Sequence, residues 1–371
     1  MPFFLKALYY KRPVSCYTIS TLQLRIYDVY NYYLRRMHFM INRCAHCVMP
    51  ETEGHIALDD NGICNICNKH LHQEQKEGSP IVHNGLSDLR KKVQESKPAA
   101  DSAYDALVAL SGGKDSTMAL YVTVKELELR PLAVFIDNGF CTEAMYSNVR
   151  NATDKLGVDL LIYAPQLIKK LFKHLLLSKS RVYYCRICNA LIDYYLRSIA
   201  QQQGIPLLIT GLTKGQEFLK GTELFWIYRA SDANLLRAID GQPEFKQVAD
   251  MFASLALYFH KNFSSITQVA PFHYLIYEEK EILSVLTNEL GYTLPSVSWP
   301  QGSTNCLFNF VSQSLTVDYF GYSQHEAEIS ALVRNNEMTR ERALEIIETP
   351  ISEKQMELAL AKLDLTHKDI F

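Results

Sequence analysis

One hexapeptide constrains the fold of this chain more than any other feature. It reads Ser111-Gly112-Gly113-Lys114-Asp115-Ser116 and follows LVAL, an apolar run typical of a buried parallel strand. Residues 117–127 then have the apolar spacing of a helix. The hexapeptide is therefore predicted to form a strand-to-helix turn, where glycines let an anion approach the backbone closely. Amides at the helix start, serine hydroxyls and the lysine would bind a phosphate there.

The hexapeptide differs from the mononucleotide P-loop, which requires G-x-x-x-x-G-K-[ST]. It resembles instead the S-G-G-x-D-S loop of the PP-loop ATPases, the adenine nucleotide alpha-hydrolase superfamily. The resemblance implies that ATP is cleaved between its α and β phosphates, with Mg²⁺ bridging phosphate oxygens and the loop holding the departing pyrophosphate. It implies catalytic roles for Lys114, on phosphate charge, and for Asp115, in orienting the loop or the metal. A helix N-cap contact is the alternative for Asp115.

Strand and helix patterns alternate after the hexapeptide, as in a doubly wound, mostly parallel α/β sheet. Strands are expected at 131–139, 158–164 and 205–211. Helices are expected over 144–156, 168–177 and 189–202. The pattern predicts a Rossmann-like nucleotide-binding domain.

Residues just beyond the carboxyl ends of these strands are candidate ligand contacts, because open parallel sheets bind ligands there. Asp137, Asn138 and Gly211 occupy such positions. The superfamily resemblance implies that Asp137 contacts the adenosine, and that Glu217, in the turn GLTKGQE, lies near the nucleotide. A simple turn that ends the strand is the alternative interpretation of Asp137.

Four paired cysteines precede the hexapeptide with the spacing C-x2-C-x16-C-x2-C. They are Cys44, Cys47, Cys64 and Cys67. Two residues between the members of a pair let a tight turn aim both sulfurs at one point, so two pairs supply a tetrahedron of thiolates. The spacing predicts a structural Zn²⁺ ribbon that leaves no open position for catalysis. Four unrelated reduced cysteines are the alternative.

The ribbon motifs C-x-x-C-V-M-P-E-T and D-D-x-G-I-C-x-x-C, placed ahead of the hexapeptide, resemble the N-acetyl sugar amidotransferases of surface-polysaccharide synthesis. Two C-terminal stretches, HYLIYEEKEILSVLTNELGY and EISALVRNNEMTRERALEIIE, resemble that family too. The resemblance implies that ATP adenylates the amide oxygen of a nucleotide-sugar substrate and that ammonia displaces AMP. Since no glutaminase domain is visible in the sequence, the resemblance implies an external ammonia source. The partners of that family resemble the glutaminase and cyclase subunits of imidazole glycerol phosphate synthase.

Two segments depart from that family, and both departures introduce cysteines. YYCRICNAL replaces a Pro-Thr-Asp-His-like sequence and contains Cys185 and Cys188, and QGSTNCLFN contains Cys306. Three cysteines so distributed resemble the PP-loop enzymes that thiolate tRNA on a [4Fe-4S] cluster, and three thiolates suit such a cluster. We expect the three thiols to converge beside the nucleotide. A second zinc, a redox pair and inert core thiols are the alternatives.

Composition excludes some classes of protein. Apolar residues make up 48% of 371 residues, so extended disorder is excluded, and a net charge of −2 gives no global attraction to nucleic acid. No apolar stretch is long enough to span a membrane. Nine cysteines, six of them in Cys-x-x-Cys pairs, suggest a reducing compartment, and we expect a cytoplasmic protein.

The chain is expected to have five parts. These are an N-terminal extension (1–40), the zinc ribbon (41–72), a linker (73–103), the PP-loop domain (104–235) and a mainly helical region (236–371). Met37 and Met40 are alternative starts to Met1. Three functions are consistent with this organisation: an amidotransferase, a sulfur transferase with tRNA or a metabolite as acceptor, and a non-catalytic nucleotide-binding protein.

Overall fold

A computed structural model describes residues 42–77, 85–96, 102–213, 223–276, 278–300 and 306–371. The chain divides into two units, 1–43 and 44–371. The features below belong to the second unit. The predicted extension, Cys16 and Glu217 lie outside the described residues.

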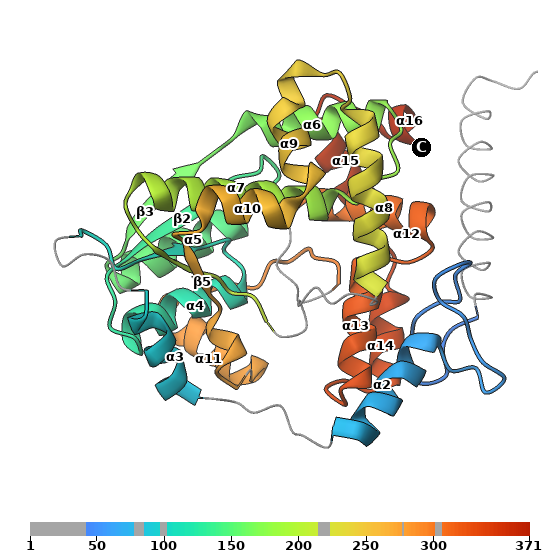
Figure 1. The fold of residues 1–371 in the computed structure, drawn as a ribbon, viewed down its shortest axis with the longest axis horizontal. Helices are drawn as coiled ribbons and strands as arrows, with labels where there is room; N and C mark the ends of the chain where they lie inside the picture. The colour runs from blue at the N-terminus through green and yellow to red at the C-terminus, as the bar shows by residue number, and fades with distance from the viewer. Residues whose placement is uncertain (1–41, 78–84, 97–101, 214–222, 277, 301–305) are drawn as a thin grey trace, which may run out of the picture. The chain divides into compact units, whose positions relative to one another are not determined.

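A five-stranded parallel sheet forms the centre of this unit, in the order β3-β2-β1-β4-β5 (Figure 1). The strands are β1 (Ala106–Ala109), β2 (Pro131–Ile136), β3 (Asp159–Tyr163), β4 (Leu207–Ile209) and β5 (Thr267–Val269). The chain builds outward from β1 to β3 and then returns to place β4 on the other side of β1. This reversal of strand order confirms the predicted doubly wound α/β fold.

Fifteen α-helices surround the sheet or extend from it within the described residues. They are α2 (Asn65–Glu77), α3 (Gly85–Gln94), α4 (Lys114–Lys125), α5 (Glu143–Leu156), α6 (Gln166–Leu177), α7 (Tyr184–Gln202), α8 (Glu223–Ala238), α9 (Lys246–Ala253), α10 (Leu255–Phe263), α11 (Glu279–Leu290), α12 (Phe308–Phe320), α13 (Gln324–Arg334), α14 (Arg340–Ile347), α15 (Glu353–Ala361) and α16 (His367–Ile370).

Alternate strand residues face opposite sides of the sheet, and each side is covered by its own helices. Leu107 and Leu132 pack with α7 and α10, whereas Val108 and Ala133 pack with α3, α4, α5 and α11 (Figure 1). Both faces of β1 and β2 are therefore apolar, as expected for a sheet covered on both sides.

Two elements differ from the expectations. Helix α7 begins at Tyr184, five residues earlier than the predicted 189, because the buried Tyr184 and Ile187 pack into the core and stabilise an additional turn. Strand β5 pairs with β4 but comes from the segment expected to be mainly helical. Only three residues long, β5 is too short to show a strand period in the sequence.

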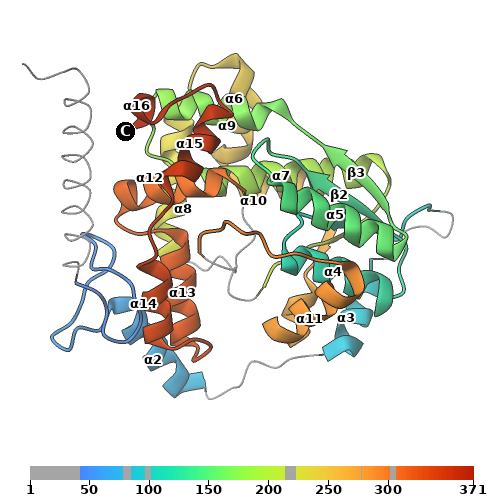
Figure 2. The same cartoon turned by 180° about the vertical axis from the view of Figure 1, so that it is seen from behind.

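The C-terminal helices pack on the ribbon as well as on one another. In Figure 2 the ends of α13 and α14 lie beside the ribbon segment. Tyr183, Leu224 and Tyr322 share one buried cluster with the four ribbon cysteines. The ribbon is therefore part of a common core within this unit.

A buried ion pair fastens α8 to α13. Arg334 Nη2 lies 2.7 Å from Glu223 Oε1, and their side chains are 6% and 3% exposed. We expect Arg334→Met to lower the free energy of unfolding by about 3–5 kcal/mol, because it leaves a buried carboxylate without its counter-charge. Denaturant unfolding measures this. The exposed pair Arg342–Glu345 supplies the control: Arg342→Met should cost less than about 1 kcal/mol. Equal losses of unfolding free energy in Arg334→Met and Arg342→Met would contradict the stabilising role of the buried Arg334–Glu223 pair.

Candidate functional site

The predicted phosphate loop connects β1 to α4. Gly113 is the N-cap residue of α4, with extended backbone angles, and no side chain among the described residues caps it. The first amides of this twelve-residue helix are thus available at its positive end, where they suit an anion. Asp115 stands inside the first turn, so it is not the N-cap residue.

Two glycines allow chain segments to meet at the loop. Gly112 has φ +79°, and a Cβ there would lie 2.4 Å from the carbonyl oxygen of Met145 in α5. Gly211 follows β4, and its Cβ would lie 2.5 Å from the amide nitrogen of Ser116. The structure therefore brings Gly211 to the loop, and neither position has room for a side chain.

The two loop serines hold its shape. Ser111 Oγ and Ser116 Oγ are 2.9 Å apart, and Ser116 Oγ accepts a hydrogen bond from the Ser111 amide at 3.1 Å. Ser116 Oγ also donates to the Gly113 carbonyl oxygen at 3.1 Å. These bonds fix the loop before any ligand binds, which reduces the entropy that binding costs.

Lys114 projects from the loop toward two carboxylates. Its Nζ lies 3.5 Å from Glu279 Oε1 in α11 and 3.8 Å from Asp115 Oδ1. Sequence reasoning missed Glu279, because nothing in an acidic helix start indicates that it faces the loop.

Glu279 competes with phosphate for Lys114. We expect Glu279→Gln to raise ATP affinity about two- to threefold, since an exposed ion pair contributes only about 0.2–1 kcal/mol. Calorimetric titration with ATP measures the change. Glu281→Gln, on the same helix, is the matched control and should leave the affinity unchanged. A weaker affinity in Glu279→Gln would show that the carboxylate assists binding instead.

Asp137 follows β2 at the same edge of the sheet. Its Oδ1 accepts a hydrogen bond from the Gly139 amide at 2.8 Å, and its Oδ2 accepts one from the Tyr146 hydroxyl at 2.5 Å. The carboxylate thus forms a strand-ending turn and fastens α5, as the alternative interpretation expected. A contact with adenosine remains a proposal.

Three cysteines contact Asn138, the residue after Asp137, and a fourth, Cys185, lies one helical turn from Cys188. We call the four the thiol group: Cys141, Cys185, Cys188 and Cys306. Asn138 Nδ2 donates to Cys188 Sγ at 3.6 Å, and Cys141 Sγ donates to Asn138 Oδ1 at 3.6 Å. The Asn138 side chain also hydrogen-bonds Cys306. The three predicted thiols therefore lie in one region at the edge that bears the phosphate loop. Sequence reasoning missed Cys141, although it follows a candidate strand end closely.

Burial keeps these thiols protonated. Burial, followed by the nearby Cys306, raises the pKa of Cys185 to about 12 and that of Cys188 further. Burial likewise raises the pKa of Cys141 and Cys306. Among the described residues, only the ribbon cysteines bring three or more ligand atoms within 4.8 Å of one another. The thiol group is thus too open for one ion, and a second structural zinc does not fit it.

The ribbon cysteines form a compact tetrahedron. Cys44 and Cys67 have sulfurs 3.8 Å apart, as do Cys47 and Cys64, and all four are buried. Four sulfurs about 2.3 Å from a zinc ion lie about 3.8 Å from one another. Backbone amides point at the sulfurs, among them the Cys64 amide at 3.2 Å from Cys44 Sγ. The donor set and spacing fit Zn²⁺; iron–sulfur ligation would place each thiolate on a different iron and so farther apart.

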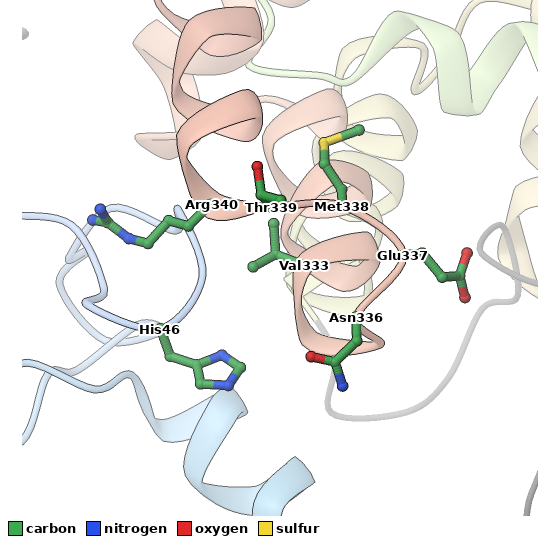
Figure 3. A pocket seen from close by; sticks show the side chains of 7 residues that line it. All are labelled: His46, Val333, Asn336, Glu337, Met338, Thr339 and Arg340. Atoms are coloured by element: carbon green, nitrogen blue, oxygen red, sulfur yellow. The ribbon is translucent and has the colours of Figure 1, made fainter.

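Helix α14 anchors the ribbon from outside. Arg340 donates to the carbonyl oxygens of Cys44 and Cys47, at 3.0 and 2.9 Å. Beside it lies a pocket of about 370 Å³ (Figure 3). The lining residues are His46, Val333, Asn336, Glu337, Met338, Thr339 and Arg340. None of them is a predicted site residue.

The strand–turn–helix arrangement expected from the PP-loop resemblance is confirmed: SGGKDS spans the turn after the central strand β1 and the first residues of α4. Within the described residues, no helix is long and apolar enough to cross a membrane.

Known proteins match this chain over different lengths. Residues 304–370 match a family described as LPS biosynthesis protein WbpG-like, C-terminal domain. An uncharacterized protein of Methanocaldococcus jannaschii, MJ1599, is 26% identical over 311 residues, which cover 79% of this chain and 95% of that protein.

Two enzymes are among the solved structures that match this chain. The U34-tRNA thiolase NcsA from Methanococcus maripaludis, solved with its [4Fe-4S] cluster, has a TM-score of 0.34 and 16% identity. That comparison covers 82% of this chain and 88% of the thiolase. NMN synthetase from Francisella tularensis has a TM-score of 0.37 and 14% identity, over 69% and 93% of the two chains.

Proposed function

We propose that this protein is an ATP-dependent PP-loop enzyme that adenylates an amide oxygen and then transfers nitrogen to the amide carbon. The phosphate loop carries the proposal: Gly112 is pressed against Met145, and the amides at the start of α4 are available to an anion. Such preorganised donors stabilise a leaving pyrophosphate. The loop residues, Asp137, Gly211 and Glu217 are the nucleotide-binding residues we propose.

The reaction has two steps. The amide oxygen bonds to the α phosphorus as the α–β bond breaks, and pyrophosphate leaves with charge stabilised by Lys114 and the loop amides. Mg²⁺ would supply further charge stabilisation when bound, and we propose that Asp115 orients it. Ammonia then attacks the activated carbon, and AMP leaves with the amide oxygen. The product is an amidine.

The acceptor we propose is an acetamido group on a nucleotide sugar used for surface polysaccharide, including LPS. The WbpG-like match over residues 304–370 supports that assignment. Ammonia would come from a separate glutaminase subunit. The ribbon cysteines and the thiol group form no disulfides, which suits a reducing compartment, and we propose the cytoplasm.

A sulfur transferase is the second candidate, and the thiol group favours it. Cys185, Cys188 and Cys306 are the residues that would hold a [4Fe-4S] cluster, and the cluster would bind an external sulfide that takes the place of ammonia. The acceptor would then be tRNA or a metabolite. A non-catalytic protein on this fold would bind ATP without turnover.

Product analysis tests the proposed function. With a competent acceptor, ATP should yield AMP and pyrophosphate, and Ser111→Ala should abolish turnover without unfolding the protein. ADP and phosphate would overturn the proposal. Iron and sulfide analysis of anaerobically purified protein separates the two candidates: brown protein that loses its colour in Cys185→Ala supports sulfur transfer. Colourless, iron-free protein from cells able to build clusters leaves the amidotransferase.

A further inference from the structure

A polar cluster, buried on α12 and partly exposed on α13, joins the start of α7 to these two helices. Its members, the polar cluster below, are Tyr183, Asn309, Gln313, Gln324, His325 and Glu328. Asn309 Nδ2 donates to the Trp299 carbonyl oxygen at 2.8 Å, so its Oδ1 is left to accept from Gln313 Nε2 at 3.0 Å. This backbone contact fixes the orientation of both amides.

The remaining hydrogen bonds of the polar cluster all lead from donor to acceptor toward the carboxylate of Glu328. Gln313 Nε2 also donates to the Tyr183 hydroxyl at 3.5 Å, and that hydroxyl donates to Gln324 Oε1. Gln324 Nε2 in turn donates to one oxygen of Glu328. His325 Nδ1 donates to the other at 3.1 Å. The carboxylate therefore terminates both branches as an acceptor.

Two acceptors are left over. Gln313 Oε1 and His325 Nε2 are buried, and neither has a hydrogen-bond partner among the residues that the structure describes. Gln313 is 1% exposed. In the neutral ring whose Nδ1 donates to Glu328, His325 Nε2 presents a lone pair. Buried polar atoms are nearly always partnered in proteins, so a pair of unmet acceptors in one cluster indicates a ligand that supplies donors.

The polar cluster adjoins the thiol group. Cys185 Sγ donates to Ser312 Oγ at 3.2 Å and lies 3.9 Å from Gln313 Nε2. Cys185 and Cys188 are one helical turn apart on α7, and Cys188 contacts Asn138 beyond the end of β2. A molecule bound at Gln313 is therefore connected, through a short series of contacts, to the edge that bears the phosphate loop.

We propose that Gln313 and His325 bind hydroxyl or amide N–H groups of the acceptor, a neutral acetamido sugar. The acceptor's identity rests on the proposed function. The chemistry of the cluster favours a donor-rich neutral group, because Gln313 and the neutral His325 ring present acceptors and the carboxylate of Glu328 would repel phosphate. The nucleotide part of a nucleotide sugar therefore lies outside the polar cluster.

Calorimetry on the full-length, zinc-loaded protein tests this proposal with UDP-N-acetylglucosamine and with UDP. The sugar nucleotide should bind about tenfold more tightly than UDP. Gln313→Leu and, separately, His325→Ala should each remove most of that difference while leaving the affinity for UDP unchanged. Gln247→Leu makes the same change at an exposed position of α9, and this variant should retain the difference in affinity between the sugar nucleotide and UDP.

Equal affinities of the wild-type protein for the two probes would overturn the proposal. The proposal would also be overturned if a folded His325→Ala variant preferred the sugar nucleotide over UDP as strongly as the wild type does. This second variant keeps the test decisive if Gln313→Leu does not fold. Failure here is distinct from failure of the proposed function. If AMP and pyrophosphate form but the variants retain the preference, only this site assignment is wrong. If ATP yields ADP, the proposed function is wrong whatever the sugar affinities are.

Discussion

Cys64→Ser should abolish zinc binding and the cooperative unfolding of the protein together. Structural zinc contributes an apparent 10–16 kcal/mol in small domains, about as much as the whole stability of a typical protein. The spacing of the cysteines predicts an independent ribbon whose loss would leave the nucleotide domain folded. The shared core with Tyr183, Leu224 and Tyr322 predicts a wider effect, because these residues lose the surface on which they pack.

Metal analysis and thermal unfolding by circular dichroism measure this effect. The wild-type chain should contain one zinc ion. Cys141→Ser is the matched control, a buried cysteine outside the ribbon, and it should retain that ion. Unchanged zinc content in Cys64→Ser would contradict the tetrahedral site. Zinc loss with unchanged unfolding of the helices would contradict the common core.

Gly112→Ala should abolish nucleotide binding. The left-handed backbone costs an alanine about 1 kcal/mol, and the added Cβ would clash with the Met145 carbonyl oxygen, a backbone atom that cannot move without shifting α5. Loop and helix must therefore separate, and the phosphate amides lose their alignment. We expect an affinity for ATP at least about a hundredfold weaker, measured by calorimetry.

Gly157→Ala separates the cost of the left-handed backbone from the effect of the clash between the added Cβ and Met145. Gly157 has φ +65°, close to the +79° of Gly112, but an added Cβ would meet nothing within 4 Å. It should lose about 1 kcal/mol of stability and keep its affinity for ATP. If both variants bind ATP like the wild type, the close contact of the loop with α5 has no part in binding.

The loop and the sheet were predictable because their signals are local. The residues of β1 are apolar throughout, and only Leu110 separates them from SGGKDS. By contrast, β5 contributes three residues whose strand conformation depends on pairing with β4, a contact that no local pattern contains. The early start of α7 depends in the same way on the burial of Tyr184.

The sequence indicated most residues of the candidate site, but it did not indicate which of them contact one another. The sequence indicated Cys185, Cys188 and Cys306 by their departure from a family pattern, yet Cys141 joins them only because β2 and α7 meet at Asn138. Glu279 reaches Lys114 across the fold, from a helix far along the chain. Long-range contacts of this kind follow from the packing of whole elements.

Isotope transfer tests the central claim most directly. An acceptor that supports turnover is labelled with heavy oxygen in its amide carbonyl and incubated with ATP, Mg²⁺ and ammonium, and the nucleotide products are analysed by mass spectrometry. Adenylation of the amide oxygen predicts that the label appears in the phosphate of AMP. Unlabelled AMP, or ADP with labelled inorganic phosphate, would contradict the account.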